Sequence, residues 1–267
     1  MIVVPIIAAA GYKIPKTSSR SITSPAGTSD TVEVLAPVSL NLNKFKEVVK
    51  KTNGALVWGG GQKLAAADDK LIRIRHPLSL DPEGMILSSI IAKKYAVSAT
   101  HLLVDIPVGK GAKVESKKDA KKLKKHFLKI CKKLGIKTRV VISEGSSPIG
   151  KGIGPLLESK DVLQTLMNHP DASADLREKS LRICAEIFEL VGRAKGRKAY
   201  RLAKFYLDSG KAYDKFKEIL LEQGGEEKMM NPENLILGKY KKEIRAHKSG
   251  VIKYCLLYTS DAADRRG

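Results

Sequence analysis

Short apolar runs and stretches of helical spacing alternate along this chain, and their order restricts the possible folds more than any other feature. Strands that take turns with helices pack most simply as a parallel sheet covered by those helices. We therefore predict an α/β protein, with a large domain in which helices flank a mostly parallel mixed sheet. The expected strands are 31–35, 55–58, 101–107 and 138–143, and the expected helices are 43–51, 85–95, 116–134 and most of 159–223, broken near 192–196 and 210.

Both ends of the chain are unusual. Residues 1–10 are apolar, lack a basic leader and run into Gly11 and Lys13, which favours a core strand or a buried helix over a signal peptide. Residues 255–267 resemble the translation of a sequencing adapter, so we exclude them from the fold. We expect a chain truncated at both ends, with apolar surface uncovered on residues 1–10, and therefore inactive and poorly soluble by itself.

Composition narrows the classes of partner and excludes several kinds of site. The 267 residues are 43% apolar, enough for a real core, and Lys+Arg exceed Asp+Glu by 49 to 28, a net charge of +21. Such a field favours nucleic acid, phosphorylated metabolites or anionic lipid. No apolar run approaches the ~20 residues of a membrane span. The three cysteines, Cys131, Cys184 and Cys255, are scattered and suggest neither a disulfide framework nor a zinc site. Their pattern fits a protein of the reducing cytoplasm.

The most basic stretch, 117–137, is interpreted as an amphipathic helix. Ser116 and Asp119 form a capping box, and Gly135 ends the helix. Lysines fill the exposed positions, and no base-stacking aromatic residues are interleaved, which favours a solvated face over a nucleic-acid surface. Its apolar face consists of Ala120, Leu123, Phe127, Ile130, Cys131 and Leu134.

The segment 17–30 concentrates serine and threonine hydroxyls around Arg20 and Gly27. Hydroxyls and backbone N–H groups surround an oxyanion without titrating, and an arginine adds a bidentate contact. From composition alone an ordinary Ser/Thr/Pro/Gly turn stays the stronger interpretation of this segment.

Three further loops are candidates for ligand contacts. In 73–84, Asp81 precedes Pro82, an arrangement typical of a helix N-cap. The loop 107–113 follows a buried strand and so lies at the carboxyl edge of the sheet, where α/β proteins bind ligands. The loop 147–154 is either a site of close backbone approach to a ligand or a turn before the next helix.

Taken together, these segments resemble the thymidine/pyrimidine-nucleoside phosphorylase superfamily, and most closely its archaeal AMP phosphorylase branch. The string Lys-Thr-Ser-Ser-Arg-Ser-Ile-Thr-Ser-Pro-Ala-Gly-Thr-Ser-Asp at 16–30 carries the resemblance, which extends over roughly residues 1–253. Nucleoside phosphorylases of this superfamily tend to have Gly-Arg-Gly-x-x-His-Thr-Gly-Gly-Thr at this place. A hydroxyl-rich loop suits a substrate that carries its own 5′-phosphate.

The resemblance implies roles for individual residues. Asp81 is the implied proton donor, with Arg75 and Lys93 as neighbouring candidates for contacts to the base. Ser18 and Thr28 are implied to lie near inorganic phosphate. The implied nucleotide-binding residues are Ser19, Arg20, Ser21, Ile22, Thr23, Ser24, Thr28, Ser89 and Lys113.

The implied reaction is phosphorolysis, in which AMP and phosphate give adenine and ribose 1,5-bisphosphate. The resemblance implies no cofactor and no metal, nucleotide and phosphate as partners, and a homodimer or larger homo-oligomer. It also implies a small helical lobe and a larger α/β lobe that close on the substrate. The implied domains are 1–80 with 97–242 as the α/β domain, 81–96 as a helix of the small lobe, and 243–254 as the start of a C-terminal domain, with a strand from residue 244.

Two other functions remain open. A pyrimidine-nucleoside phosphorylase would act on substrates without a 5′-phosphate. A basic RNA-binding protein is supported only by the net charge of +21, and its affinity would fall steeply with salt.

Overall fold

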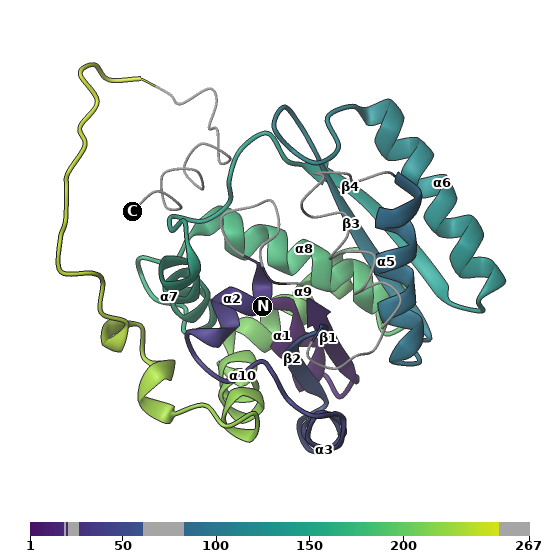
Figure 1. The fold of residues 1–267 in the computed structure, drawn as a ribbon, viewed down its shortest axis with the longest axis horizontal. Helices are drawn as coiled ribbons and strands as arrows, with labels where there is room; N and C mark the ends of the chain where they lie inside the picture. Colours follow the sequence, from purple (N-terminus) through teal and green to yellow (C-terminus); the bar gives the residue numbers. More distant parts are fainter. Residues whose placement is uncertain (19, 21–26, 61–82, 251–267) are drawn as a thin grey trace.

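The computed structural model describes residues 1–18, 20, 27–60 and 83–250 (Figure 1). Helices and strands alternate through its first part, and helices alone follow. In chain order the elements are α1 (Val3–Ala9), β1 (Ile14–Ser18), α2 (Thr28–Glu33), α3 (Leu42–Thr52), β2 (Gly54–Trp58), α5 (Glu83–Ala96), β3 (His101–Val108), α6 (Lys117–Lys133), β4 (Lys137–Glu144), α7 (Pro155–Leu166), α8 (Ala174–Leu190), α9 (Arg197–Asp208), α10 (Lys211–Glu222), η2 (Glu227–Met230) and η3 (Pro232–Asn234).

The strands form two parallel pairs, which confirms the predicted α/β class. β1 pairs with β2 from Ile14–Gly54 to Ser18–Trp58, and β3 pairs with β4 over eight residues of each strand. In the part of the chain that the structure describes, no hydrogen bonds join the two pairs into one sheet. The carboxyl ends of β1 and β2 lie together because the two strands run in the same direction.

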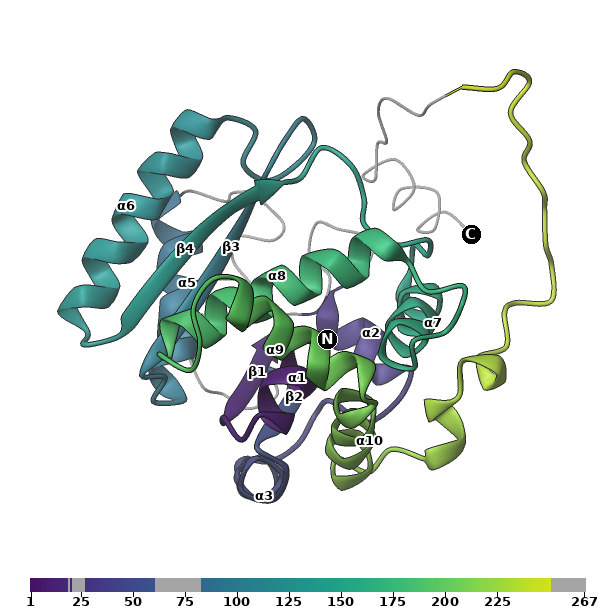
Figure 2. The ribbon, with the colours of Figure 1, turned by 180° about the vertical axis from the view of Figure 1, so that it is seen from behind.

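Helix α1 lies at the centre of the larger core. Ile6 and Ile7 are buried there among the apolar side chains of α7 to α10, and Figure 2 shows α8, α9 and α10 around α1. The sequence left residues 1–10 open between a core strand and a buried helix, and the structure has the helix. The expectation of uncovered apolar surface on this segment is wrong, because α8, α9 and α10 cover it.

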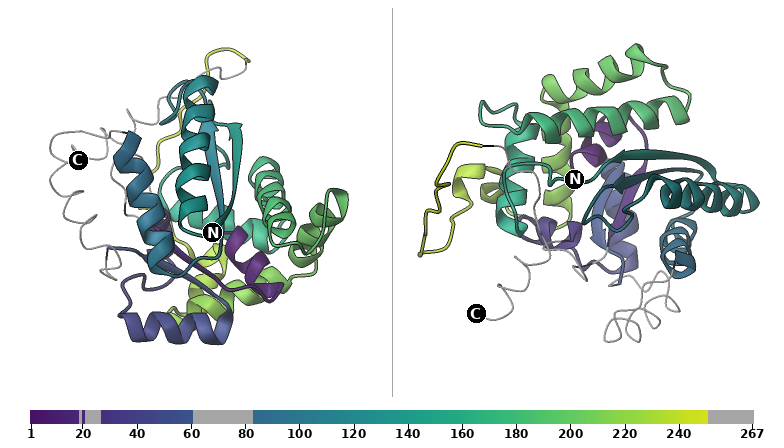
Figure 3. Two further views of the ribbon diagram at one scale, coloured as in Figure 1. Left: turned by 90° about the vertical axis from the view of Figure 1, so that its right-hand side faces the viewer. Right: turned by 90° about the horizontal axis from the view of Figure 1, so that it is seen from above.

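A second core fills the space between the β3–β4 pair and helices α5 and α6. Phe127 of α6 packs there with Leu102 of β3 and with Leu87 of α5. Helix α8 lies on the opposite face of the pair (Figure 3). There Lys179 forms an ion pair with Asp105 at 3.1 Å.

Helix α6 confirms that the basic stretch forms an amphipathic helix. The Ser116 hydroxyl accepts a hydrogen bond from Asp119 N–H at 3.0 Å and donates to the Asp119 carboxylate at 2.6 Å. Gly135 ends the helix with a φ of +70°, in the left-handed region that favours glycine. Of the six predicted apolar positions, Ile130 and Leu134 are more exposed than expected, at 36% and 38%.

Two short elements differ from the prediction. Residues 31–35 were expected to form a strand, but Thr28–Glu33 is helix α2, because the Asp30 carboxylate accepts the Gly27 N–H at 2.9 Å and so starts a helical turn. Strand β1 was not predicted, since its sequence Ile-Pro-Lys-Thr-Ser is largely polar.

The ends of the described chain bear on other expectations. Residues 239–250 are exposed and form neither helix nor strand, so the strand expected from residue 244 is not formed over its described part. Residues 255–267 lie outside the described residues. Among the described helices, none combines the length and the apolar character needed to cross a bilayer.

Gln223, at the end of α10, holds the edge of β2. Its side chain accepts from Leu56 N–H at 2.8 Å and donates to the carbonyl oxygens of Leu56 and Pro37, each at 3.1 Å, while only 3% of the residue is exposed. It therefore pairs with the edge of β2 as a neighbouring strand would.

Replacing Gln223 by leucine is expected to lower the free energy of unfolding by about 2–3 kcal/mol, because buried backbone groups of Leu56 lose their partners. Urea denaturation measures the change. Glu227→Leu, which also replaces a polar side chain by leucine but at an exposed position, serves as control. Its free energy of unfolding is expected to stay within about 0.5 kcal/mol of that of the unsubstituted protein. Equal effects of the two substitutions would contradict this role for Gln223.

Candidate nucleotide and phosphate site

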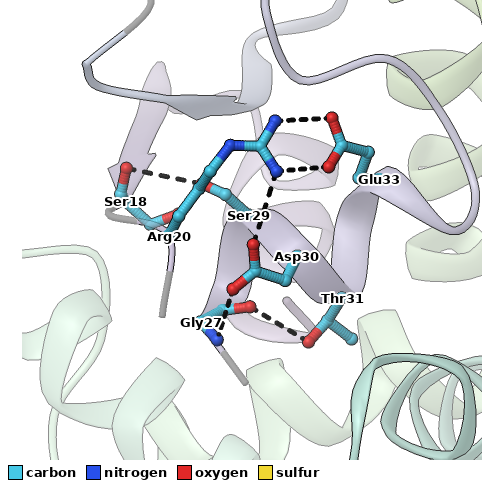
Figure 4. Close-up of polar contacts among 7 residues, drawn as sticks. All are labelled: Ser18, Arg20, Gly27, Ser29, Asp30, Thr31 and Glu33. Atoms are coloured by element: carbon cyan, nitrogen blue, oxygen red, sulfur yellow. Dashed lines mark hydrogen bonds and ion pairs between the residues drawn. The ribbon is translucent and has the colours of Figure 1, made fainter. Parts of the chain in front are cut away.

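The carboxyl end of β1 and the start of α2 meet through their hydroxyl groups (Figure 4). The Ser18 and Ser29 oxygens lie 2.6 Å apart, and Ser29 also donates to the Ser18 carbonyl oxygen at 3.4 Å. Thr28 precedes Ser29, so the two residues predicted to lie near inorganic phosphate, Ser18 and Thr28, are brought to one place. Ser29 itself was not predicted, because nothing in its local sequence distinguishes it from the surrounding serines.

Arg20 is held by acidic side chains of α2. Its guanidinium forms hydrogen bonds to both carboxylate oxygens of Glu33, one of them at 2.6 Å, and a longer contact to Asp30 at 3.4 Å. The Arg20 side chain also lies over the Trp58 ring, 4.9 Å from its centroid. The hydrogen bond from Arg20 lowers the pKa of Glu33, so this carboxylate keeps its charge. The bidentate contact that the sequence predicted for a bound oxyanion is therefore made to Glu33 in this structure.

Helix α5 brings lysines to the same strand end. Lys93 Nζ donates to Ser89 Oγ at 3.3 Å, so two residues of the predicted site are neighbours on one helix face. A Cβ placed on Gly59 would lie 3.6 Å from the Ser18 carbonyl oxygen and 3.7 Å from Lys93 Cδ, which puts the Lys93 side chain close to Ser18. Lys94 donates to Thr17. Positive charge therefore gathers behind the hydroxyl cluster.

A half-buried carboxyl group supports α2 from the other side. Glu158 of α7 accepts a hydrogen bond from the Thr31 hydroxyl at 3.1 Å, and Ser159 donates to the Thr31 carbonyl oxygen at 2.7 Å. Burial raises the pKa of Glu158. Thr28, Thr31 and Glu158 line a cavity of about 390 Å³. Glu158 was not predicted as a neighbour of this site, since 127 residues separate it from Thr31.

The loop 147–154 is a turn held by the protein's own carboxylates. The Asp161 carboxylate accepts N–H groups of Lys151 and Gly152 at 2.6 and 2.7 Å, and Asp175 accepts that of Gly150 at 3.3 Å. These N–H groups are thus engaged internally. Of the two interpretations that the sequence left open, the structure favours the turn before α7.

Lys113 lies on the loop after β3, at the carboxyl end of that strand as predicted, and its side chain is exposed. A Cβ on Gly109 would lie 2.4 Å from the backbone nitrogen of Ser146, so this loop packs directly against the one that follows β4. The remaining predicted site residues lie outside the described residues: Ser19, Ser21, Ile22, Thr23, Ser24, Arg75 and Asp81.

Within the ranges that the structure describes, no group of three or more His, Cys, Asp or Glu side chains is placed to hold a metal ion. Beside the carboxylates of Asp30, Glu33 and Glu158, the described site offers hydroxyls, ammonium groups and one guanidinium as hydrogen-bond donors. Such donors bind oxyanions.

Known proteins similar to this chain include phosphorylases, in agreement with a site that binds oxyanions. Residues 2–213 match a family model described as glycosyl transferase family, a/b domain. An AMP phosphorylase of Methanocaldococcus jannaschii is 46% identical over 252 residues, and one of Pyrococcus abyssi is 47% identical; each match covers 94% of this chain and 50% of the relative. A protein of Methylococcus capsulatus provisionally named thymidine phosphorylase is 45% identical, over 94% of this chain and 48% of that protein. The chain spans about half the length of the curated relatives it matches.

Proposed function

The chain belongs to the glycosyl transferase family whose a/b domain its residues 2–213 match, and we propose that it forms the nucleotide- and phosphate-binding part of a nucleotide phosphorylase. In the proposed reaction, AMP and phosphate give adenine and ribose 1,5-bisphosphate. A phosphate oxygen forms a bond to C1′ of the ribose, the bond from C1′ to the base nitrogen breaks, and the base leaves with a proton supplied by Asp81. A cytoplasmic location and assembly as a homo-oligomer belong to the same proposal.

The hydroxyl cluster backed by lysines supports this function most directly. Ser18 and Ser29 contact each other at the end of β1, Thr28 adjoins them, and Lys93 lies close behind. Uncharged donors bind a phosphate without adding a titrating group, and nearby cations stabilise its negative charge. Two of the relatives are named AMP phosphorylase, and these names support a nucleoside 5′-monophosphate as the substrate of this chain.

The complete gene product is expected to release adenine from AMP only when phosphate is added, and to release base from uridine much more slowly. Chromatography of the base against phosphate concentration measures both. Adenine release without phosphate would indicate a hydrolase. Rapid phosphorolysis of uridine with none of AMP would instead support a pyrimidine-nucleoside phosphorylase, the function suggested by the name of the Methylococcus capsulatus relative.

The Arg20–Glu33 pair leads to a prediction about affinity. Glu33→Gln is expected to tighten AMP binding about fivefold, because Arg20 turns to the nucleotide without breaking an exposed ion pair, which is worth up to about 1 kcal/mol. Calorimetric titration with AMP measures the change. Glu47→Gln on α3, which also removes a carboxylate near lysines, is the control and should leave the affinity unchanged. Weaker AMP binding by Glu33→Gln would contradict a nucleotide contact by Arg20.

A further inference from the structure

We propose that Lys94 is a positioning residue of this site, because its ammonium group holds the carboxyl end of β1 and so sets where Ser18 faces the substrate. This inference rests on the proposed function, because Lys94 would serve the same phosphate and nucleotide site. Lys94 lies in the last turn of α5, 77 residues from Thr17 in sequence. Its Nζ donates to the carbonyl oxygen and to the hydroxyl of Thr17, each at 3.2 Å.

The pairing of β1 shows why this contact matters. Ile14 donates to Asn53 and Ser18 accepts from Gly59, so these two residues of β1 direct their backbone groups toward β2. Backbone groups alternate in direction along a strand, and the backbone of Thr17 therefore faces away from β2. On that side lies a cavity of about 690 Å³, lined by Lys94 together with residues of β1 and β3. Lys94 thus donates to the Thr17 carbonyl oxygen, the acceptor to which a neighbouring strand would otherwise donate, directly before Ser18.

Among the residues that the structure describes, the charged groups near Lys94 are basic. Lys16 of β1 and Lys93 of α5 act on it electrostatically, and Lys13 and His101 line the same cavity. Over the described ranges, neither Lys16 nor Lys94 forms an ion pair with a carboxylate. Burial, with the two lysine charges, lowers the pKa of Lys94 to about 7, and burial lowers that of Lys16. An anion bound beside Ser18 opposes this shift, so Lys94 takes up a proton when the anion binds.

The test uses sulfate as a non-titrating probe and AMP as the nucleotide. Calorimetry at pH 8 in buffers of different ionisation enthalpy should show uptake of most of one proton per sulfate bound. Lys94→Met should bind both ligands at least about tenfold more weakly and take up no proton. Lys94→Arg should recover the affinity without the proton uptake. Lys121→Met, an exposed lysine of α6, is the control and should behave as the unsubstituted chain.

A ligand-free measurement separates this inference from the proposed function. The backbone amide signals of Thr17 and Ser18 should shift between pH 6 and pH 9 with a midpoint of about 7, and Lys94→Met should abolish that step. If the step is present but neither sulfate nor AMP binds, the proposed function fails and the hold of Lys94 on β1 stands. Absence of the step, or unchanged affinity and proton uptake in Lys94→Met, would overturn the positioning role.

Discussion

Replacing Asp81 by asparagine is expected to lower the kcat of AMP phosphorolysis by the complete gene product roughly 10²–10⁴-fold, the range for loss of a general acid. A purine anion is a poor leaving group, and under the proposed mechanism only a protonated Asp81 neutralises it as the bond to C1′ breaks. AMP affinity should change little, since protonation of the leaving base belongs to the transition state. Stopped-time assays of adenine release give kcat and KM separately.

A change of leaving group provides the control for this first prediction. A nucleotide whose base leaves readily without a proton should lose far less activity in Asp81→Asn than AMP does. If AMP and that substrate lose the same factor, Asp81 does not act as the acid. If AMP turnover is unchanged, the assignment of Asp81 is wrong.

Thr28→Val should weaken the binding of AMP and of phosphate by about 10–100-fold. Valine keeps the shape of threonine and removes the hydroxyl, and a hydrogen bond to a charged group contributes about 1.5–3 kcal/mol, where each 1.4 kcal/mol is a factor of ten. The loss should appear in KM rather than in kcat, because this contact exists in both the ground state and the transition state.

Thr28→Ser is the matched control, because it keeps the hydroxyl and should bind AMP within about threefold of the unsubstituted protein. Helix α2 should persist in both variants, since its start depends on Asp30 and Gly27 rather than on the Thr28 side chain. Equal affinities of Thr28→Val and Thr28→Ser would exclude the hydroxyl from the site.

The fold could be predicted from the sequence where apolar spacing is strong. Helix α6 and the strands on either side of it have clear periodicities, and their bounds differ from the prediction by at most one residue. Strand β1 lacks such a pattern. Its polar residues are held as a strand by pairing with β2 and by the contact from Lys94, which no local sequence signal reveals. Helix α2 was mistaken for a strand because the Asp30–Gly27 hydrogen bond outweighs the apolar run that follows.

For the candidate site, the sequence predicted which residues gather but not which side chains they contact. The hydroxyl-rich string spans the end of β1 and the start of α2, two elements that were not themselves predicted, and the structure brings Ser18, Arg20 and Thr28 together there. The partners of these residues were not predictable. Glu33 lies 13 residues from Arg20 and Glu158 lies 127 from Thr31, and only the folded chain brings each pair into contact.

The most direct test of the proposed site is a crystal structure of the protein with AMP bound and with sulfate in place of inorganic phosphate. The sulfate is expected beside Ser18 and Thr28, and the AMP against Thr28, with the Arg20 guanidinium turned from Glu33 toward the nucleotide. AMP bound in the cavity between β1 and β3, or a Ser18–Ser29 contact with no sulfate beside it, would contradict the proposed site.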